Sequence, residues 1–335
     1  AAFTREALAS YLPALQRIIE SALARWAAGG ERPLLPELKL LAMEGICRNV
    51  LGMEPGAELD RLVADYGVLF KGFTGLPIDV PGMPFHAALK ARDRILAQLA
   101  AQVQRHRAGG LDDGLSRVLA ARDAGGIGLD PAHAAAEMHH FVLAGVIVFA
   151  ELGALVLELS RHPAVRSRLL AEVKAAAPAG PVTPAQLREM PYLDQVVMEV
   201  KRTCPNVPVS FGRARVPIRI GELTIPAGWN VMMALGAHNL NPIFEEPEKF
   251  DPDRFGPPRA EQDRHPHAFA PQGAGSVPEG HKCAGYDYST VFMQLFAVLL
   301  TRGYTWEVPP QDLSMNKALI PPELKGGLRV VIRKA

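Results

Sequence analysis

One short stretch combines a cysteine with an unusual density of glycine. Residues 269–285 read FAPQGAGSVPEGHKCAG, with Cys283 near the end and an apolar, helix-like run directly after it. A thiol at a helix N-terminus faces unpaired backbone N–H groups and the positive end of the helix dipole, which favours its thiolate. The glycines before it let the backbone approach a flat ligand closely. Taken alone, the stretch is more typical of a buried cysteine in a glycine-rich loop.

Two motifs upstream carry paired charges. Glu199 and Arg202 are three residues apart in a predicted helix, so they share one face of it. Residues 250–255 read FDPDRF and hold Arg254 between aromatic side chains in a proline-rich loop. A solvated ion pair is the ordinary interpretation of such charges when each motif is taken alone. Their order and their spacing before Cys283 favour a different interpretation.

The three motifs, in this order and at these intervals, resemble the cytochrome P450 family, the haem-thiolate oxygenases. The resemblance runs along the whole chain and implies a single domain, 1–335, that lacks the family's N-terminal elements. It implies haem b as cofactor, with the Cys283 thiolate as axial ligand and metal-binding residue. Such a ligand donates electron density to iron and favours O–O cleavage. Glu199, Arg202 and Arg254 are implied as a buried charge network that braces the cysteine loop.

The resemblance also implies which residues contact the haem and the substrate. The implied cofactor contacts, besides Cys283, are His281, Arg213, Gly273, Gly275, Gly285, Ala144 and Gly145. His281 and Arg213 are implied as partners of the haem propionates, with a plain surface arginine as the alternative for Arg213. The implied substrate pocket contains Leu143, Ile147, Val148, Val209, Ser210 and Leu319, the last with its neighbours Ala318 and Ile320. Each pocket residue is also typical of simple core packing.

Two departures from the family pattern bear on the chemistry. The family's central helix carries an acid and an alcohol that deliver protons, whereas residues 143–149 here read LAGVIVF. We interpret Glu151, further along the same helix, as a surface or interhelical contact. The cysteine loop is extended by residues 276–279, and Gln272 replaces the phenylalanine that normally shields the sulfur. This loop resembles the fatty-acid peroxygenase and hydroperoxide-rearranging branches, whereas residues 60–97 resemble the retinoid-hydroxylase-like bacterial members.

These departures shape the expected function. The leading hypothesis is a haem-thiolate oxidoreductase that oxidises a lipophilic small molecule, such as a fatty acid or a terpenoid. Hydrogen peroxide as oxidant, or rearrangement of a hydroperoxide substrate, would make the missing acid and alcohol unnecessary. The first alternative is a conventional O2-dependent monooxygenase that takes electrons from a ferredoxin or flavoprotein reductase. The second is a haem-binding protein without turnover.

The surrounding elements predict a mostly helical, α+β protein with a small β-rich part. Periodic apolar residues predict helices at 4–28, 34–51, 59–70, 85–106, 113–123, 130–160, 163–176 and 191–203, and a further one starting at Cys283. Strand-like patterns are confined to 207–234 and 314–333. The helix at 130–160 is apolar on nearly every face in its middle, so we expect it to cross the core.

Composition narrows the class of protein. Hydrophobic residues make up 48% and charged residues 21% of the 335 residues, and the net charge is +1. These values are typical of a globular protein with a large core, and the even spread of charge argues against a nucleic-acid partner. Three widely separated cysteines indicate neither a disulfide framework nor a zinc site, which fits a reducing cytoplasm. The most apolar segment, 141–157, contains Glu151 and predicts a core helix, not a transmembrane segment.

Overall fold

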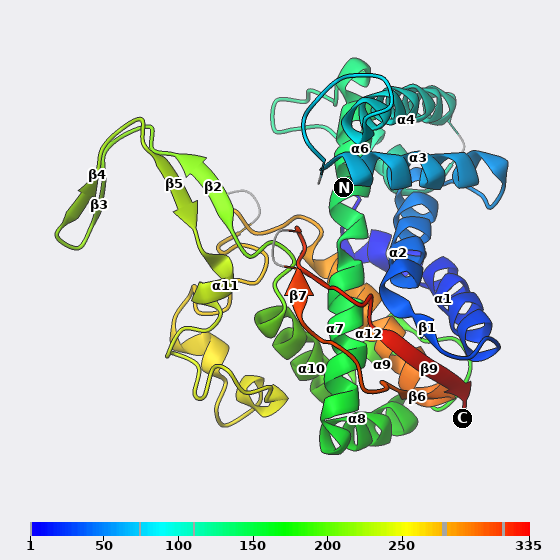
Figure 1. Cartoon of the computed structure of the whole chain (residues 1–335), viewed down its shortest axis with the longest axis vertical. Helices are drawn as coiled ribbons and strands as arrows, with labels where there is room; N and C mark the ends of the chain where they lie inside the picture. The colour runs from blue at the N-terminus through cyan, green and yellow to red at the C-terminus, as the bar shows by residue number, and fades with distance from the viewer. Residues whose placement is uncertain (1, 74, 110, 277–279, 317–318) are drawn as a thin grey trace.

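The computed structural model describes residues 2–335 except 74, 110, 277–279, 317 and 318. Helices dominate the molecule (Figure 1). The helices are α1 (Arg5–Ala27), α2 (Leu34–Leu51), α3 (Ala57–Phe73), α4 (Pro84–Arg107), α5 (Gly114–Ala120), α6 (Pro131–Val146), α7 (Val148–Arg161), α8 (Pro163–Ala176), α9 (Pro184–Arg188), α10 (Pro191–Thr203), α11 (Leu235–His238) and α12 (Tyr286–Gly303), with 3-10 turns η1 (Pro252–Phe255) and η2 (Glu261–Arg264). The mostly helical fold expected from the sequence is therefore confirmed.

The core lies where α1, α2, α7, α10 and α12 meet. These helices carry apolar side chains at helical spacing, and their inward faces are fully buried. Phe292 and Phe296 of α12 lie at the centre, and Phe296 packs edge-on against Trp26 of α1. Local signals set the helix ends: the Thr4 side chain accepts a hydrogen bond from the backbone N–H of Ala7, and Gly52 ends α2 with φ 60°.

Strands form small sheets at the edges of this core. β1 (Arg32–Pro33), β9 (Arg329–Lys334) and β6 (Tyr304–Glu307) make one antiparallel sheet in that order. The described residues also form three two-stranded antiparallel sheets: β2 (Ser210–Arg213) with β5 (Asn230–Met233), β3 (Ile218–Ile220) with β4 (Leu223–Ile225), and β7 (Met315–Asn316) with β8 (Glu323–Leu324). The β2–β5 and β3–β4 pairs project from the helical body (Figure 1). Phe211 of β2 and Leu223 of β4 are exposed, and so is Trp229, directly before β5.

The predicted helix over 130–160 is two helices that meet at Ile147. The Ile147 carbonyl accepts the backbone N–H of Ala150 at 3.2 Å, a tightened turn of the 3-10 kind. Beside this break, a Cβ added at Gly145 would lie 2.7 Å from the Ile46 side chain, so glycine permits close contact with α2. The span His133–Arg161 is long and apolar enough to cross a membrane, but 67% of its most apolar window is buried, as in a core helix.

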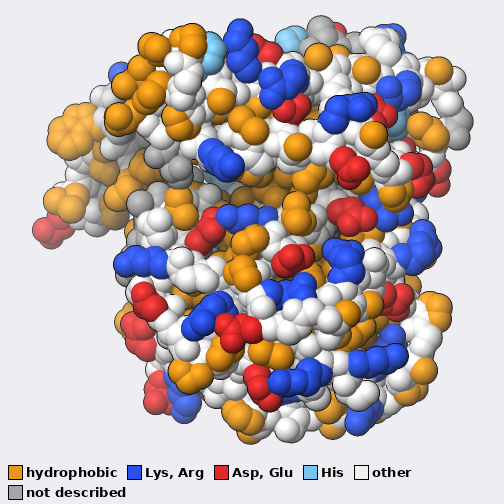
Figure 2. All heavy atoms as spheres, turned by 45° about the vertical axis from the view of Figure 1, so that its right-hand side comes forward, with side chains coloured by type: hydrophobic (Ala, Val, Ile, Leu, Met, Phe, Trp, Pro, Cys, Tyr) orange, Lys and Arg blue, Asp and Glu red, His pale blue; other side chains and the backbone are white. Residues whose placement is uncertain are grey.

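Charged side chains of both signs are interspersed on the face that Figure 2 presents. Exposed ion pairs of the molecule include Arg333 with Glu307 at 3.2 Å. Exposed pairs of this kind contribute little to stability, at most about 1 kcal/mol each. The stronger electrostatic features of the molecule are buried, and they are the ones that bear on stability and on the site.

A buried histidine–aspartate pair joins the end of α4 to the start of α5. His106 Nε2 lies 2.8 Å from Asp113 Oδ2, and His106 Nδ1 lies 2.8 Å from the Gln102 carbonyl oxygen. Only the protonated imidazole can donate to both acceptors. Burial acts to lower the pKa of His106, but Asp113 and Gln102 outweigh it and the pKa is raised. Burial acts to raise the pKa of Asp113, yet the hydrogen bonds from His106 and Ser116 leave it lowered.

We expect this pair to stabilise the fold within a definite pH window. The raised His106 pKa contributes stability that is complete below the ordinary value near 6.5 and is lost as the pH rises through the folded-state value. The lowered Asp113 pKa contributes stability above the ordinary value near 3.8 that is lost on acidification. Urea unfolding of His106→Gln should therefore show its largest deficit against the wild type between about pH 4 and 6.5. A deficit that grows on going to pH 9 would contradict this, and Asp130→Asn, in an exposed pair with His133, is the control.

Candidate active site at the cysteine loop

The cysteine lies in a loop that precedes α12. The prediction that the helix starts at the cysteine is wrong, because α12 begins at Tyr286 with Gly285 as its N-cap. A tight turn separates them, in which the Cys283 carbonyl accepts the Tyr286 backbone N–H at 3.2 Å. The backbone N–H of Cys283 donates to the Gln272 carbonyl at 2.8 Å, and that of His281 donates to the Ala274 carbonyl at 3.1 Å. The loop thus folds back on itself and leaves the Cys283 side chain exposed.

Glycines make this fold-back possible. Gly273 has φ 85°, and a Cβ there would lie 1.9 Å from the His281 carbonyl oxygen. Gly275 has φ 79°, and a Cβ there would lie 3.1 Å from the Cα of Gly280. Both positions therefore need glycine for conformation and for space. The result is a wall of bare backbone beside the cysteine.

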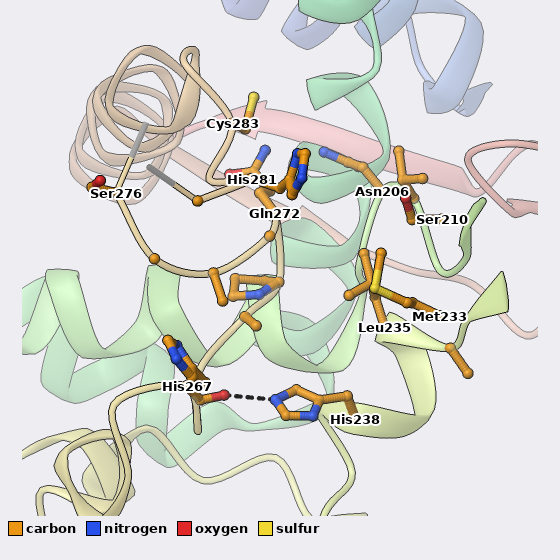
Figure 3. A pocket seen from close by; sticks show the side chains of 18 of the residues that line it. Asn206, Ser210, Met233, Leu235, His238, His267, Gln272, Ser276, His281 and Cys283 are labelled. Carbon is orange, nitrogen blue, oxygen red and sulfur yellow. Dashed lines mark hydrogen bonds between the residues drawn. The ribbon is translucent and has the colours of Figure 1, made fainter. Parts of the chain in front are cut away.

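This wall borders a cavity of about 910 Å³. In Figure 3 Cys283 lies at the top of the view, with His281 and Gln272 below it and Asn206 beside them. The cavity is lined by Ile147, Asn206, Val207, Ser210, Met233, Ala234, Leu235, His238, His267, Ala270, Pro271, Gln272, Gly273, Ala274, Gly275, Ser276, Gly280, His281 and Cys283. Its volume is at the upper end of the range of ligand pockets, and its walls are mainly apolar.

A network of buried charged side chains joins α10 and η1 near the loop. Glu199 on α10 accepts two hydrogen bonds from Arg202, at 2.7 and 2.8 Å, and one from Arg254 of η1 at 3.1 Å. All three side chains are fully buried. The two guanidinium groups also donate to backbone carbonyls of the segment 239–249, which leads toward the loop. The network therefore fastens that segment to α10.

The network has a fourth member that sequence reasoning missed. Glu261, fully buried in η2, accepts from Arg254 Nη1 at 2.8 Å and from Arg259 Nη2 at 2.7 Å. Burial acts to raise the pKa of Glu261, but hydrogen bonds from Arg259 and Arg254 outweigh it and leave the pKa lowered. No periodic pattern marks Glu261 in the sequence, because it lies in an irregular loop.

A second buried pair lies closer to the cysteine loop. Lys201 of α10 pairs with Glu151 of α7 at 3.2 Å, and both side chains are fully buried. The interhelical alternative for Glu151 is thus confirmed, and the surface alternative is wrong. Sequence reasoning did not assign Lys201 a role. Its position, one helical turn after the buried Val197, is a signal that could have placed it on the inner face of α10.

Comparison with known proteins decides the family. Residues 78–325 match the family model described as cytochrome P450.

The chain belongs to the cytochrome P450 family.

Individual relatives agree with this assignment. Putative cytochrome P450 120 from Synechocystis sp. is 28% identical over 335 residues, which covers 98% of this chain and 74% of that protein. Cytochrome P450 26B1 of Danio rerio is 27% identical over 343 residues, which covers 98% of this chain and 66% of that protein. The structure of retinoic acid-bound cyanobacterial CYP120A1 superposes with a TM-score of 0.90 at 27% identity, over 100% of this chain and 77% of that one.

Cytochromes P450 bind haem b, and the residues present fit that group. Cys283 offers an exposed sulfur ligand on the cavity wall. Gly273 and Gly275 line the same cavity wall, so backbone without side chains faces the space beside the sulfur. Gly285 lies close to the sulfur, because a Cβ added at Gly285 would be 3.8 Å from Cys283 Sγ. Within the described part of the chain no other cluster of metal-ligating side chains competes with this site.

The structure brings some predicted site residues together and separates others. Cys283, His281, Gly273, Gly275, Ile147 and Ser210 all line the cavity. Val148 stays a prediction: its side chain is buried in the core beside the helix break and does not line this cavity. Gly145 stays one too, and it packs against Ile46. Arg213 donates to the Gly228 carbonyl at 2.9 Å on the projecting sheet.

The remaining predicted residues stay predictions. Leu143, Val209 and Leu319 are partly buried and Ala144 is exposed, and none of them lines this cavity. Ala318 and the inserted residues 277–279 lie outside the described residues. Asn206, His238 and His267, which do line the cavity, come from loops and a short helix that the sequence patterns did not single out.

Proposed function

We propose that this protein is a haem-thiolate oxidoreductase that oxidises a lipophilic small molecule. The observation that carries the proposal is the exposed Cys283 sulfur on the wall of a large, mainly apolar cavity. When bound with a thiolate ligand, haem supplies oxygen-atom transfer chemistry. The residues of this chain hold the ligand loop rigid and enclose an apolar substrate. The structure of retinoic acid-bound CYP120A1 supports an apolar carboxylic acid as the substrate class.

We further propose that the reaction is peroxide-driven, or a hydroperoxide rearrangement. Ile147 occupies the cavity wall at the helix break, and Val148 is buried beside it. Neither side chain can donate a proton, and residues 143–149 of this helix region, which read LAGVIVF, carry no acid or alcohol of the kind that conventional oxygen activation uses. Hydrogen peroxide carries its own protons and electrons, so that substrate plus peroxide gives hydroxylated substrate plus water. A hydroperoxide substrate would rearrange without any external oxidant.

The second candidate is a monooxygenase that uses O2 and a redox partner. The names of relatives favour it, among them abscisic acid 8'-hydroxylase 2 of Oryza sativa, 28% identical over 350 residues. In that reaction O2, two electrons and two protons convert the substrate to its hydroxylated product and water. A ferredoxin or flavoprotein reductase would supply the electrons, and water in the cavity would supply the protons.

One comparison separates these candidates. Haem-loaded protein is mixed with retinoic acid or myristic acid, and then with either hydrogen peroxide or a reductase system with NADPH. We expect hydroxylated product with peroxide alone, at a rate at least about tenfold above that with the reductase system, which equals about 1.4 kcal/mol in barrier height. Product only with the reductase system would overturn the peroxide proposal. No product with either would favour a haem-binding protein without turnover.

A further inference from the structure

The Lys201 ammonium is buried and fully hydrogen-bonded. Its Nζ donates to Ser289 Oγ at 2.7 Å, to Gln272 Oε1 at 3.0 Å and to Glu151 Oε2 at 3.2 Å. It also lies 4.9 Å from the centre of the Tyr286 ring. An ammonium group has three N–H donors, and each finds an acceptor here. The surroundings are therefore built for a charged lysine.

Gln272 connects this ammonium to the cysteine. Its side-chain oxygen accepts from Lys201, while its backbone carbonyl accepts the backbone N–H of Cys283 at 2.8 Å. Ser289, the third acceptor, lies in the first turn of α12, on the other side of the same loop. Lys201 thus holds the cysteine loop at both of its ends.

The pair with Glu151 has a definite orientation. Lys201 contacts the loop directly through Gln272, and Glu151 contacts Lys201. The pair therefore forms a buried dipole whose positive end faces the cysteine loop. In a site of low dielectric constant such a charge acts over several ångströms with little screening. Burial lowers the pKa of Lys201, while the negative charges of Glu151 and then Cys283 act in the opposite direction.

We propose that the Lys201–Glu151 pair tunes the Cys283 thiolate, with Lys201 as a positioning residue. The inference rests on Cys283 as the iron ligand. A positive charge behind the thiolate stabilises its negative charge, reduces its donation to the iron and so favours the reduced metal. Partners outside the ligand set tune metal centres in this way. Glu151 moderates the effect, because its carboxylate partly cancels the ammonium charge.

The direction in which the haem reduction potential shifts shows whether the pair acts through its charges or only holds the loop in place. If Lys201 only held the loop, removal of either member of the pair would loosen the site, and both variants would shift in one direction. If the pair acts through its charges, Lys201→Met and Glu151→Gln should shift the haem reduction potential in opposite directions. Lys201→Met removes the positive charge and should lower the potential. Glu151→Gln leaves the positive charge less balanced and should raise it.

The test is a spectroelectrochemical titration of the haem-loaded protein and its variants. The reduction potential of the double variant E151Q/K201M should be lower than that of the wild type, as in K201M. The double variant leaves no unpaired charge in the core, so it provides the test if K201M folds poorly. Lys249→Met, in an exposed pair with Glu246, is the matched control and should not shift the potential. Unchanged potentials in E151Q and the double variant, or shifts of E151Q and K201M in one direction, would overturn the inference. A wild-type ferrous–CO complex without a thiolate-type band would instead overturn the proposed function.

Discussion

Replacement of Cys283 by alanine is expected to abolish turnover and the thiolate-type absorption of the ferrous–CO complex. Thiolate donation is what favours O–O cleavage at the iron, and alanine removes the sulfur from that wall of the cavity. We expect product formation to fall at least about a thousandfold, which corresponds to about 4 kcal/mol of transition-state stabilisation. Absorption spectra of the reduced, CO-treated protein and product formation by mass spectrometry would measure both effects.

Cys204 provides the matched control for this variant. It ends α10 and has no contact with the cavity beside Cys283. Burial raises the pKa of Cys204 to about 12, so this thiol stays protonated and cannot serve as a thiolate ligand at neutral pH. Cys204→Ala should keep the thiolate-type band and most of the activity. A band that persists in Cys283→Ala but disappears in Cys204→Ala would show that the ligand was assigned to the wrong residue.

The charge network could be predicted from the sequence because its members keep fixed intervals. Glu199 and Arg202 share a helical face whatever surrounds them, and the resemblance then supplied Arg254 as their partner. The structure confirms the burial of all three and their direct contacts. Helices were predictable for the same local reason, since apolar spacing and caps act within a few residues. α2, for example, has the predicted bounds of 34–51.

Features that depend on contacts between distant segments could not be predicted. The break at Ile147 has no proline to mark it, and it occurs where Gly145 packs against Ile46 of another helix. Glu261 is buried because a loop folds over Arg254, which no local pattern encodes. The cavity is likewise built from loops that meet only in the folded chain. Lys201 could be predicted only in part. Its position in the helix could have indicated that it is buried, but the sequence did not reveal Glu151 or Gln272 as its partners.

Substitution of Glu199 by glutamine is expected to have the largest effect on stability. The change removes the carboxylate that both Arg202 and Arg254 contact, so two guanidinium groups stay buried without a full counter-charge. Loss of one partner from a buried ion pair costs about 3–5 kcal/mol, because the remaining charge is uncompensated. Urea unfolding should report a loss of this size in the free energy of unfolding, and haem should be released earlier in the titration.

Glu307→Gln is the matched control for Glu199→Gln, because it also removes one carboxylate that pairs with an arginine. Glu307 and Arg333 pair at 3.2 Å on β6 and β9, but their side chains are 69% and 56% exposed. Water and salt screen such a pair, so its loss should cost about 0.2–1 kcal/mol. Equal losses in the two variants would mean that Glu199 contributes no more than a surface charge. A large loss only in Glu199→Gln, with earlier release of haem, would tie the network to the cysteine loop, because Asn239 of the segment that it fastens accepts the backbone N–H of Ala270 at 3.4 Å.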